Sequence, residues 1–310
     1  MAKTAATRQR DARVQATTGT AHSKPCACTG MRWCAACRDP ALRAQWGMRE
    51  PVGEPAFLTA REVLVGPAPG GSTVYLFDTA RQAAPGCPAF AGLVVWPDFV
   101  SEDEAERLLA EIESRPFTPA QSGKGKQHFG PRMNFRKQRM NPRGFEGLPR
   151  WGRALEARVR DRAASESSVP GLVAALDAYV TTDAFVLRYD VGQASNLDLH
   201  VDDTFAYGEL ILDLSLESDG WLTFLDADPQ RGVDRPFACV RARVPARSMA
   251  LLFGPARYDW FHGIRALDVE GRRTSLTLRT LGSSLRSTDE GRHVVARAAR
   301  VLDGPGDAPL

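Results

Sequence analysis

After about residue 180, apolar and polar residues of this 310-residue chain alternate at a period of two. Phe185, Leu187 and Tyr189 start the pattern, and Arg188 falls between them. Alternation of this kind predicts strands that bury one face. Further strands are predicted at 210–216, 221–225, 239–244, 248–253 and 274–280. This dense run of short strands restricts the possible folds more than any other feature of the sequence, because it indicates a domain built on a sandwich or barrel.

Two helices are predicted before these strands. Ser101 and Glu104 form a capping box at the start of the first helix, and Pro116 ends it. A second helix fits residues 150–164, where apolar residues recur every four positions. Helices followed by short strands indicate an α+β domain.

Composition and the positions of Pro and Gly residues divide the chain into five stretches. Apolar residues make up 43% and charged residues 25%, which excludes a wholly disordered or fibrous protein. We expect a disordered arm (1–25), a cysteine-rich module (26–37), a Pro- and Gly-rich connector (38–89), the main domain (90–282) and a partly helical tail (283–310). The apolar runs fall far short of the roughly 20 residues of a membrane helix, so we expect no contact with membranes.

The composition of the N-terminal residues gives an expectation for the cellular compartment of the protein. The N-terminus lacks the apolar core of a secretory signal, which favours the cytoplasm or nucleus. Its content of Thr and Arg, with almost no acids, also fits an organellar transit peptide.

Three residues late in the chain form a possible iron site. His200 and Asp202 stand two apart, so in an extended chain their side chains point to one side. His262 follows after a turn, and two imidazoles with one carboxylate are the ligand set of non-haem Fe(II) oxygenases. Taken alone, His-x-Asp favours a histidine that is hydrogen-bonded to a neighbouring carboxylate.

The strand at 273–279 adds a second set of polar residues. Its alternation places Arg273, Ser275, Thr277 and Arg279 on one face. Guanidinium groups pair bidentately with carboxylates, so this face suits a dicarboxylate cosubstrate. The alternative is an edge strand whose polar face is solvated.

The order His200-x-Asp202, His262, Arg273-x5-Arg279 resembles the signature of the AlkB-like Fe(II)/2-oxoglutarate dioxygenases. The likeness covers most of residues 90–282 and includes the segments 121–131, 134–138, 144–149, 245–248 and 260–264. It implies a double-stranded β-helix, or jelly roll, flanked by helices.

The resemblance also implies the residues of the site. His200, Asp202 and His262 match the family's iron ligands, and Arg273, Arg279 and Tyr189 match its 2-oxoglutarate-binding residues. Ser275 stands where bacterial-type members carry an asparagine in the same pocket.

The activity implied by the resemblance is oxidative N-demethylation with Fe(II), 2-oxoglutarate and O2, which releases succinate and formaldehyde. The substrates implied are methyl-lysine in a protein such as actin, or N6-methyladenine in DNA. Members that repair bases carry an acid two positions after the metal aspartate, where this chain has Thr204. Two other functions stay open: a side-chain hydroxylase, and a chromatin or cytoskeletal binding module with a secondary iron site.

Segment 121–143 carries seven Lys and Arg residues and no acid. Such a basic stretch favours a polyanionic partner such as nucleic acid, although a solvated loop has the same composition. By the resemblance it would be a substrate lid, with these candidate contacts: Lys124, Lys126, Phe129, Asn134, Phe135 and Arg136. Its aromatic residues suit either stacking on a substrate or packing on the barrel.

Four cysteines stand close together near the N-terminus: Cys26, Cys28, Cys34 and Cys37. Four thiolates suit tetrahedral zinc, and Cys34-x2-Cys37 has the usual spacing. We therefore predict a structural zinc site, with a redox-active cluster and an iron–sulfur cluster as the alternatives.

Overall fold

The computed structural model describes residues 39–46, 58, 66–67, 71–166, 169–226 and 236–302. The predicted arm (1–25) and the predicted zinc ligands Cys26, Cys28, Cys34 and Cys37 lie outside the described residues. The short helix α2 (Pro40–Trp46) precedes the main body of the fold.

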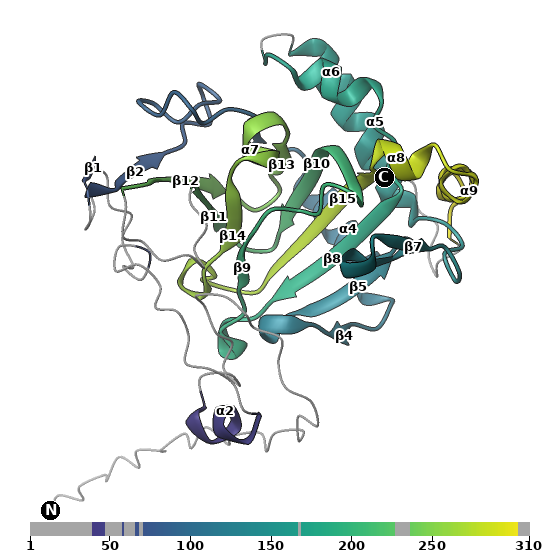
Figure 1. Cartoon of the computed structure of the whole chain (residues 1–310), viewed down its shortest axis with the longest axis horizontal. Helices are drawn as coiled ribbons and strands as arrows, with labels where there is room; N and C mark the ends of the chain where they lie inside the picture. The colour runs from purple at the N-terminus through teal and green to yellow at the C-terminus, as the bar shows by residue number, and fades with distance from the viewer. Residues whose placement is uncertain are drawn as a thin grey trace, which may run out of the picture.

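The described chain forms two large sheets that pack face to face (Figure 1). The major sheet has the order β3-β13-β10-β15-β8-β5-β4. Its strands are β3 (Leu93–Trp96), β13 (Met249–Leu252), β10 (Tyr207–Leu216), β15 (Arg273–Leu281), β8 (Asp183–Tyr189), β5 (Gly125–Phe129) and β4 (Thr118–Pro119).

The minor sheet has the order β1-β2-β12-β11-β14-β9. Its strands are β1 (Gly66–Pro67), β2 (Thr73–Leu76), β12 (Ala238–Val244), β11 (Gly220–Leu225), β14 (Phe261–Ile264) and β9 (Leu197–His200). From β8 to β15 the chain crosses repeatedly between the two sheets, and the pairs that these strands form with one another are antiparallel. This pattern of crossings is consistent with a jelly roll.

Two apolar cores hold the layers together. One lies between the sheets, where Ile211 and Leu252 of the major sheet meet Phe224 of the minor sheet. The other lies on the outer face of the major sheet, where Leu276 and Leu278 are fully buried under helices. The alternation along β15 therefore directs Leu276 and Leu278 to the helices, and Ser275, Thr277 and Arg279 to the opposite face, toward the minor sheet.

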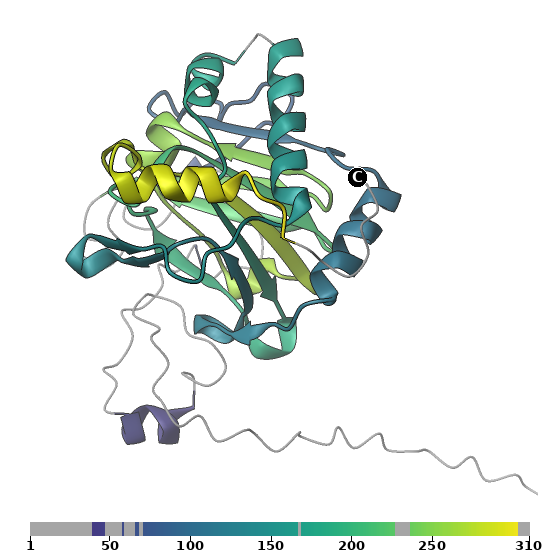
Figure 2. The ribbon, with the colours of Figure 1, turned by 90° about the vertical axis from the view of Figure 1, so that its right-hand side faces the viewer.

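Helices cover the outer face of the major sheet, and α9 crosses it in Figure 2. They are α4 (Glu102–Glu113), α5 (Arg150–Ser165), α6 (Leu172–Asp177), α8 (Ser283–Arg286) and α9 (Asp289–Ala298). The capping box at Ser101 is present, and the helix ends before Pro116 as expected. A further short helix, α7 (Gly254–Tyr258), connects β13 to β14. Among the described helices, none is both long and apolar enough to cross a bilayer.

The predicted strands and both predicted helices are confirmed, with small shifts at their ends. One boundary differs. Strand β2 pairs in parallel with β12, so the predicted connector supplies part of the minor sheet and the folded domain starts before Phe90. The tail (283–310) contains two helices, in line with the predicted partly helical tail, and Val294 and Ala298 of α9 are fully buried against the major sheet.

The basic segment is part strand and part hairpin. Strand β5 pairs with β8 in the major sheet. Strands β6 (Arg132–Asn134) and β7 (Arg139–Asn141) form a separate hairpin beside it.

Candidate metal centre and substrate groove

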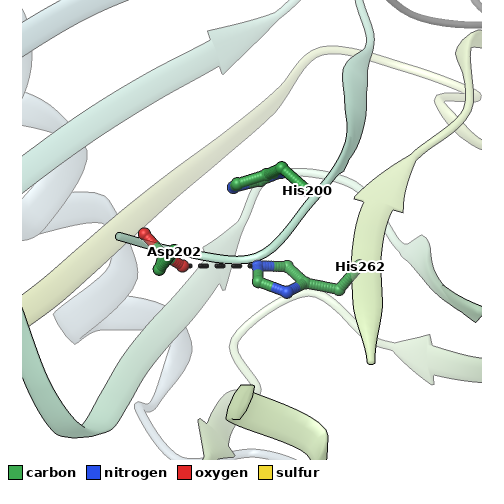
Figure 3. Close-up of side chains that lie close together, drawn as sticks. All are labelled: His200, Asp202 and His262. Atoms are coloured by element: carbon green, nitrogen blue, oxygen red, sulfur yellow. Dashed lines mark ion pairs between the residues drawn. The ribbon is translucent and has the colours of Figure 1, made fainter. Parts of the chain in front are cut away.

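Three ligand-type side chains converge between β9 and β14 at one end of the sandwich (Figure 3). His200 ends β9, and His262 lies directly opposite it in the antiparallel pair of β14 with β9. Asp202 follows His200 by two residues and points toward the same space. The convergence expected from the spacing of His200 and Asp202 is therefore confirmed.

The geometry of this cluster suits one metal ion. Its nitrogen and oxygen ligand atoms all lie within 4.8 Å of one another. The two imidazole rings have centroids 4.6 Å apart, and His262 Nε2 lies 3.4 Å from Asp202 Oδ2. Two nitrogens and one carboxylate oxygen on one side of an ion leave other coordination positions open.

The ionisation states in the cluster also suit a metal. Burial lowers the pKa of His200 to about 4, with the nearby His262 adding to the effect. His200 Nδ1 donates to the carbonyl oxygen of Asp198 at 2.8 Å, so Nε2 keeps its lone pair. Burial alone would raise the pKa of Asp202, but the hydrogen bond to His262 and the charge of Arg279 hold it well below its usual value. The cluster thus offers a neutral imidazole and a carboxylate.

The loop after His200 is held by a buried arginine. Arg257, from α7, is fully buried. Its Nη1 donates to the carbonyl oxygen of Asp202 at 2.8 Å, and its Nε donates to that of Gly208 at 3.3 Å. Backbone contacts of this kind fix the loop that carries Asp202.

A cavity of about 260 Å³ lies next to the triad. Ser275, Thr277 and Arg279 line it from β15, and Tyr189 lines it from β8. The polar face that the alternation predicts on this strand is therefore confirmed to point inward. The remaining lining is mostly apolar, with Leu187, Leu197, Ile211, Leu222, Leu252 and Ile264.

Arg273 lies fully buried beside this cavity. Its guanidinium carbon is 5.4 Å from the centre of the Tyr189 ring. Nε donates to Ser215 Oγ at 3.0 Å, and Nη2 donates to Asp213 Oδ2 at 3.2 Å. Among the described residues, Nη1 has no hydrogen-bond partner. A buried guanidinium nitrogen without a partner is costly, so this position fits a carboxylate ligand.

Arg279 is already engaged by two protein carboxylates. Its Nη1 donates to Asp202 Oδ1 at 2.9 Å, and its Nη2 lies 2.8 Å from Asp183 Oδ1. Burial alone would lower the pKa of Arg279, but these acids raise it. The expectation that Arg279 needs an anion is thus met within the protein, by Asp202 and by Asp183, and the sequence pattern did not identify Asp183.

A basic groove of about 850 Å³ adjoins the cavity. Phe135, Phe185 and Tyr207 line both, so the two spaces are adjacent. The groove is also lined by four cationic residues: Arg115, Lys126, Arg132 and Arg143. Among the described residues that line it, none is an aspartate or glutamate.

The residues predicted for the substrate lid fall into three groups. Lys126, Phe129 and Phe135 line the groove, although Phe129 also packs edge-on against Trp151. Asn134 and Arg136 belong to the exposed hairpin region and line neither the groove nor the cavity.

The prediction that Lys124 contacts the substrate is wrong. Its side chain is buried, and Nζ donates to the carbonyl oxygen of Asn196. The chain turns inward there because Ser122, Gly123 and Lys124 pack against the 190–196 loop. This ammonium is therefore unavailable to a substrate in the groove.

Comparison with known proteins shows the family. The chain is 29% identical over 283 residues to human "Alpha-ketoglutarate-dependent dioxygenase alkB homolog 4", covering 84% of this chain and 87% of that protein. It is 30% identical over 217 residues to the mouse protein of the same name, covering 63% of this chain and 69% of that protein. The chain belongs to the AlkB-like 2-oxoglutarate-dependent dioxygenases.

A third relative of this AlkB-like protein is the Caenorhabditis elegans "DNA N6-methyl adenine demethylase". It is 28% identical over 188 residues, covering 61% of this chain and 59% of that protein. No family model matches the chain. The relatives confirm that the chain is a 2-oxoglutarate-dependent dioxygenase.

The residues present fit the cofactors of this AlkB-like family. The neutral Nε2 of His200, the ionised Asp202 and His262 are the donor set that Fe(II) takes. The partnerless Nη1 of Arg273, beside the cavity, fits one carboxylate of 2-oxoglutarate. Both observations concern buried polar atoms that need a ligand.

Sequence reasoning missed several residues of the site. Asp183 and Asp213 each pair with a cavity arginine across neighbouring strands, and Arg257 holds the Asp202 loop from a helix. A signal existed for Asp213, since it stands between Leu212 and Leu214 in a mostly apolar part of the strand. The pairings themselves depend on strand register, which the pattern does not contain.

Proposed function

We propose that this AlkB-like dioxygenase removes N-methyl groups oxidatively from a nucleic acid, with N6-methyladenine in DNA as the first substrate to test. The observation that carries the proposal is the acid-free basic groove, which adjoins the metal-side cavity and shares three aromatic lining residues with it. A groove with this charge attracts phosphates. The name of the Caenorhabditis elegans relative supports the same substrate.

In this proposal His200, Asp202 and His262 hold Fe(II), and Arg273 binds one carboxylate of 2-oxoglutarate. Tyr189 and Ser275 line the same part of the cavity and complete the cosubstrate site. Bound iron, with 2-oxoglutarate and O2, supplies the oxidation that turns an N-methyl group into an N-hydroxymethyl group, which leaves as formaldehyde.

The protein orients the substrate and keeps water away from the reacting methyl group. Phe135 is half exposed at the junction of groove and cavity, and its ring centre lies 6.3 Å from that of Tyr207. An exposed aromatic ring beside a basic groove suits a base that has left its stack. The apolar lining of the cavity then surrounds the methyl group.

A methyl-lysine substrate is the second candidate, because the same aromatic rings can surround a methylated ammonium. One contact argues against it. The guanidinium carbon of Arg279 already lies 4.0 Å from the centre of the Tyr207 ring and 5.6 Å from that of Phe185. A second cation there would meet Arg279 as well as the basic groove.

The test measures formaldehyde release from a DNA oligonucleotide with N6-methyladenine and from a methyl-lysine peptide. We expect release from the oligonucleotide and little from the peptide. Release from the peptide alone would contradict the nucleic-acid proposal. Succinate formation with neither substrate demethylated would favour a hydroxylase.

A salt titration tests the groove itself. Lys126→Gln, Arg132→Gln and Arg143→Gln together should flatten the slope of log affinity against log salt by about 0.7–0.9 units for each phosphate that is no longer neutralised. A matched triple variant, with Arg81, Arg243 and Arg292 changed to glutamine, removes the same charge from exposed sites away from the groove. Equal slopes for the two variants would reject the groove as the phosphate-binding surface.

A further inference from the structure

A continuous chain of polar contacts joins the basic groove to the metal-site carboxylate. His128 lines the groove, and its Nε2 lies 2.6 Å from Asp183 Oδ2. The other oxygen of Asp183 accepts from Arg279 Nε at 3.0 Å and lies 2.8 Å from its Nη2. Arg279 Nη1 in turn donates to Asp202 Oδ1 at 2.9 Å. The family signature that covers Asp202 and Arg279 includes neither His128 nor Asp183.

Strand register places these groups together. Asp183 begins β8 directly opposite Arg279 on β15, and His128 on β5 lies opposite Phe185 of the same strand. The His128 ring lies against the Phe185 ring, with centroids 5.1 Å apart. The side chain of Asp183 is only 1% exposed, so both of its oxygens depend on protein donors.

Gly130 shows how closely the chain approaches this pair. A Cβ at residue 130 would overlap Asp183 Oδ2 and lie 3.0 Å from His128 Nε2. A side chain at this position would therefore separate His128 from Asp183. The glycine leaves the contact intact.

The two oxygens of Asp183 bind different partners, and this fixes the guanidinium of Arg279. With Oδ2 held by His128, Oδ1 is left to bind the Nε and Nη2 edge of Arg279. Only Nη1 then reaches Asp202, and it reaches Oδ1. Asp202 Oδ2 is left on the side of His262, which is the side where the ligand atoms converge.

We propose that His128 is a positioning residue for the metal centre, acting through Asp183 and Arg279 on the orientation of Asp202. The inference rests on the proposed metal-binding function of Asp202. It gives the enzyme a residue in the wall of its groove that is coupled to its metal ligands.

The test uses Co(II) as the probe, because its visible spectrum reports coordination geometry without turnover. His128→Phe removes the donor and keeps a ring on Phe185, whereas His128→Gln restores a donor amide. We expect the Phe variant to bind Co(II) about three- to tenfold more weakly, with a changed spectrum, since removing groups that touch a ligand directly weakens binding roughly 10–100-fold. The Gln variant should bind within about twofold of wild type, well below that range.

Two further variants keep the test decisive. Gly130→Ala should weaken Co(II) binding in the same direction as His128→Phe, without removing any polar group. His293→Phe, on the exposed surface of α9, serves as the matched control and should bind Co(II) as wild type does. Thermal unfolding of each variant shows whether it is folded.

The outcomes separate this inference from the proposed function. If Asp202→Ala loses Co(II) but His128→Phe and Gly130→Ala both match wild type in affinity and spectrum, the positioning function of His128 is wrong and the metal site stands. Equal losses for His128→Phe and His128→Gln would also overturn it, because the donor would not matter. Wild-type Co(II) binding by Asp202→Ala would instead refute the metal site.

Discussion

Replacing Arg273 with lysine isolates the interaction proposed for 2-oxoglutarate. The wild-type guanidinium uses Nε for Ser215 and Nη2 for Asp213, and its Nη1 has no partner among the described residues. Lysine keeps the charge but has one nitrogen in place of three. It can therefore stay paired with the buried Asp213, or it can bind the ligand, but it cannot do both with the same geometry.

The size of the effect follows from removing a single hydrogen bond between Nη1 and the ligand carboxylate. A hydrogen bond to a charged partner contributes about 1.5–3 kcal/mol. Since 1.4 kcal/mol is tenfold in affinity, the Kd for 2-oxoglutarate should rise by roughly 10–150-fold in Arg273→Lys. The affinity for the metal should stay within about twofold, because the hydrogen bonds of Arg273 go to Ser215 and Asp213, which do not belong to the chain of contacts from His128 to Asp202.

The assay is calorimetric titration of 2-oxoglutarate into protein loaded with Mn(II). Arg272→Lys is the matched control, because Arg272 is the adjacent residue, has a 57% exposed side chain and pairs with Glu217 on the surface. An unchanged Kd for 2-oxoglutarate in Arg273→Lys, or an equal rise in both variants, would refute the reasoning.

Three other changes test the framework of the site. Arg257→Ala leaves buried carbonyls near Asp202 without a donor, so urea denaturation should show a loss of about 2–5 kcal/mol in the free energy of unfolding. Wild-type stability would show that Arg257 does not hold the Asp202 loop. Asp268 is buried, which alone would raise its pKa, but Arg265 and Arg241 hold the pKa below its usual value. Its carboxylate therefore stabilises the fold above the unfolded pKa of about 3.9, and that contribution is lost as the pH falls through the folded pKa. Asp268→Asn should therefore flatten the acid limb of a curve of unfolding free energy against pH, and an unchanged acid limb would contradict this. Ser101→Ala removes the cap of α4 and should cost about 1 kcal/mol in the same denaturation assay, and a cost near zero would contradict the capping box.

The periodicity of the sequence predicted the strands and which of their side chains are buried. Alternation along β8, β10 and β15 identifies which side chains are buried, because successive residues of a strand point to opposite faces. The same rule predicted that the side chains of His200 and Asp202 point to one side of the chain. The inward direction of Ser275, Thr277 and Arg279 follows from the burial of Leu276 and Leu278 on the other face.

The pairing of strands could not be read from such patterns. Asp183 meets Arg279 because β8 and β15 pair in one register, and a shift by one residue would separate them. The burial of Lys124 likewise depends on the loop that carries Asn196, which lies 72 residues away in the chain. Contacts between distant segments of this kind complete the site, and local residue order does not encode them.

The central claim is that His200, Asp202 and His262 form the iron site of this dioxygenase. The most direct measurement is succinate formation from 2-oxoglutarate by wild type and by His262→Ala, each with and without added Fe(II). Wild type should turn over only with Fe(II), and His262→Ala should produce no succinate above background while showing a cooperative thermal unfolding transition. Wild-type turnover by a folded His262→Ala protein would contradict the claim.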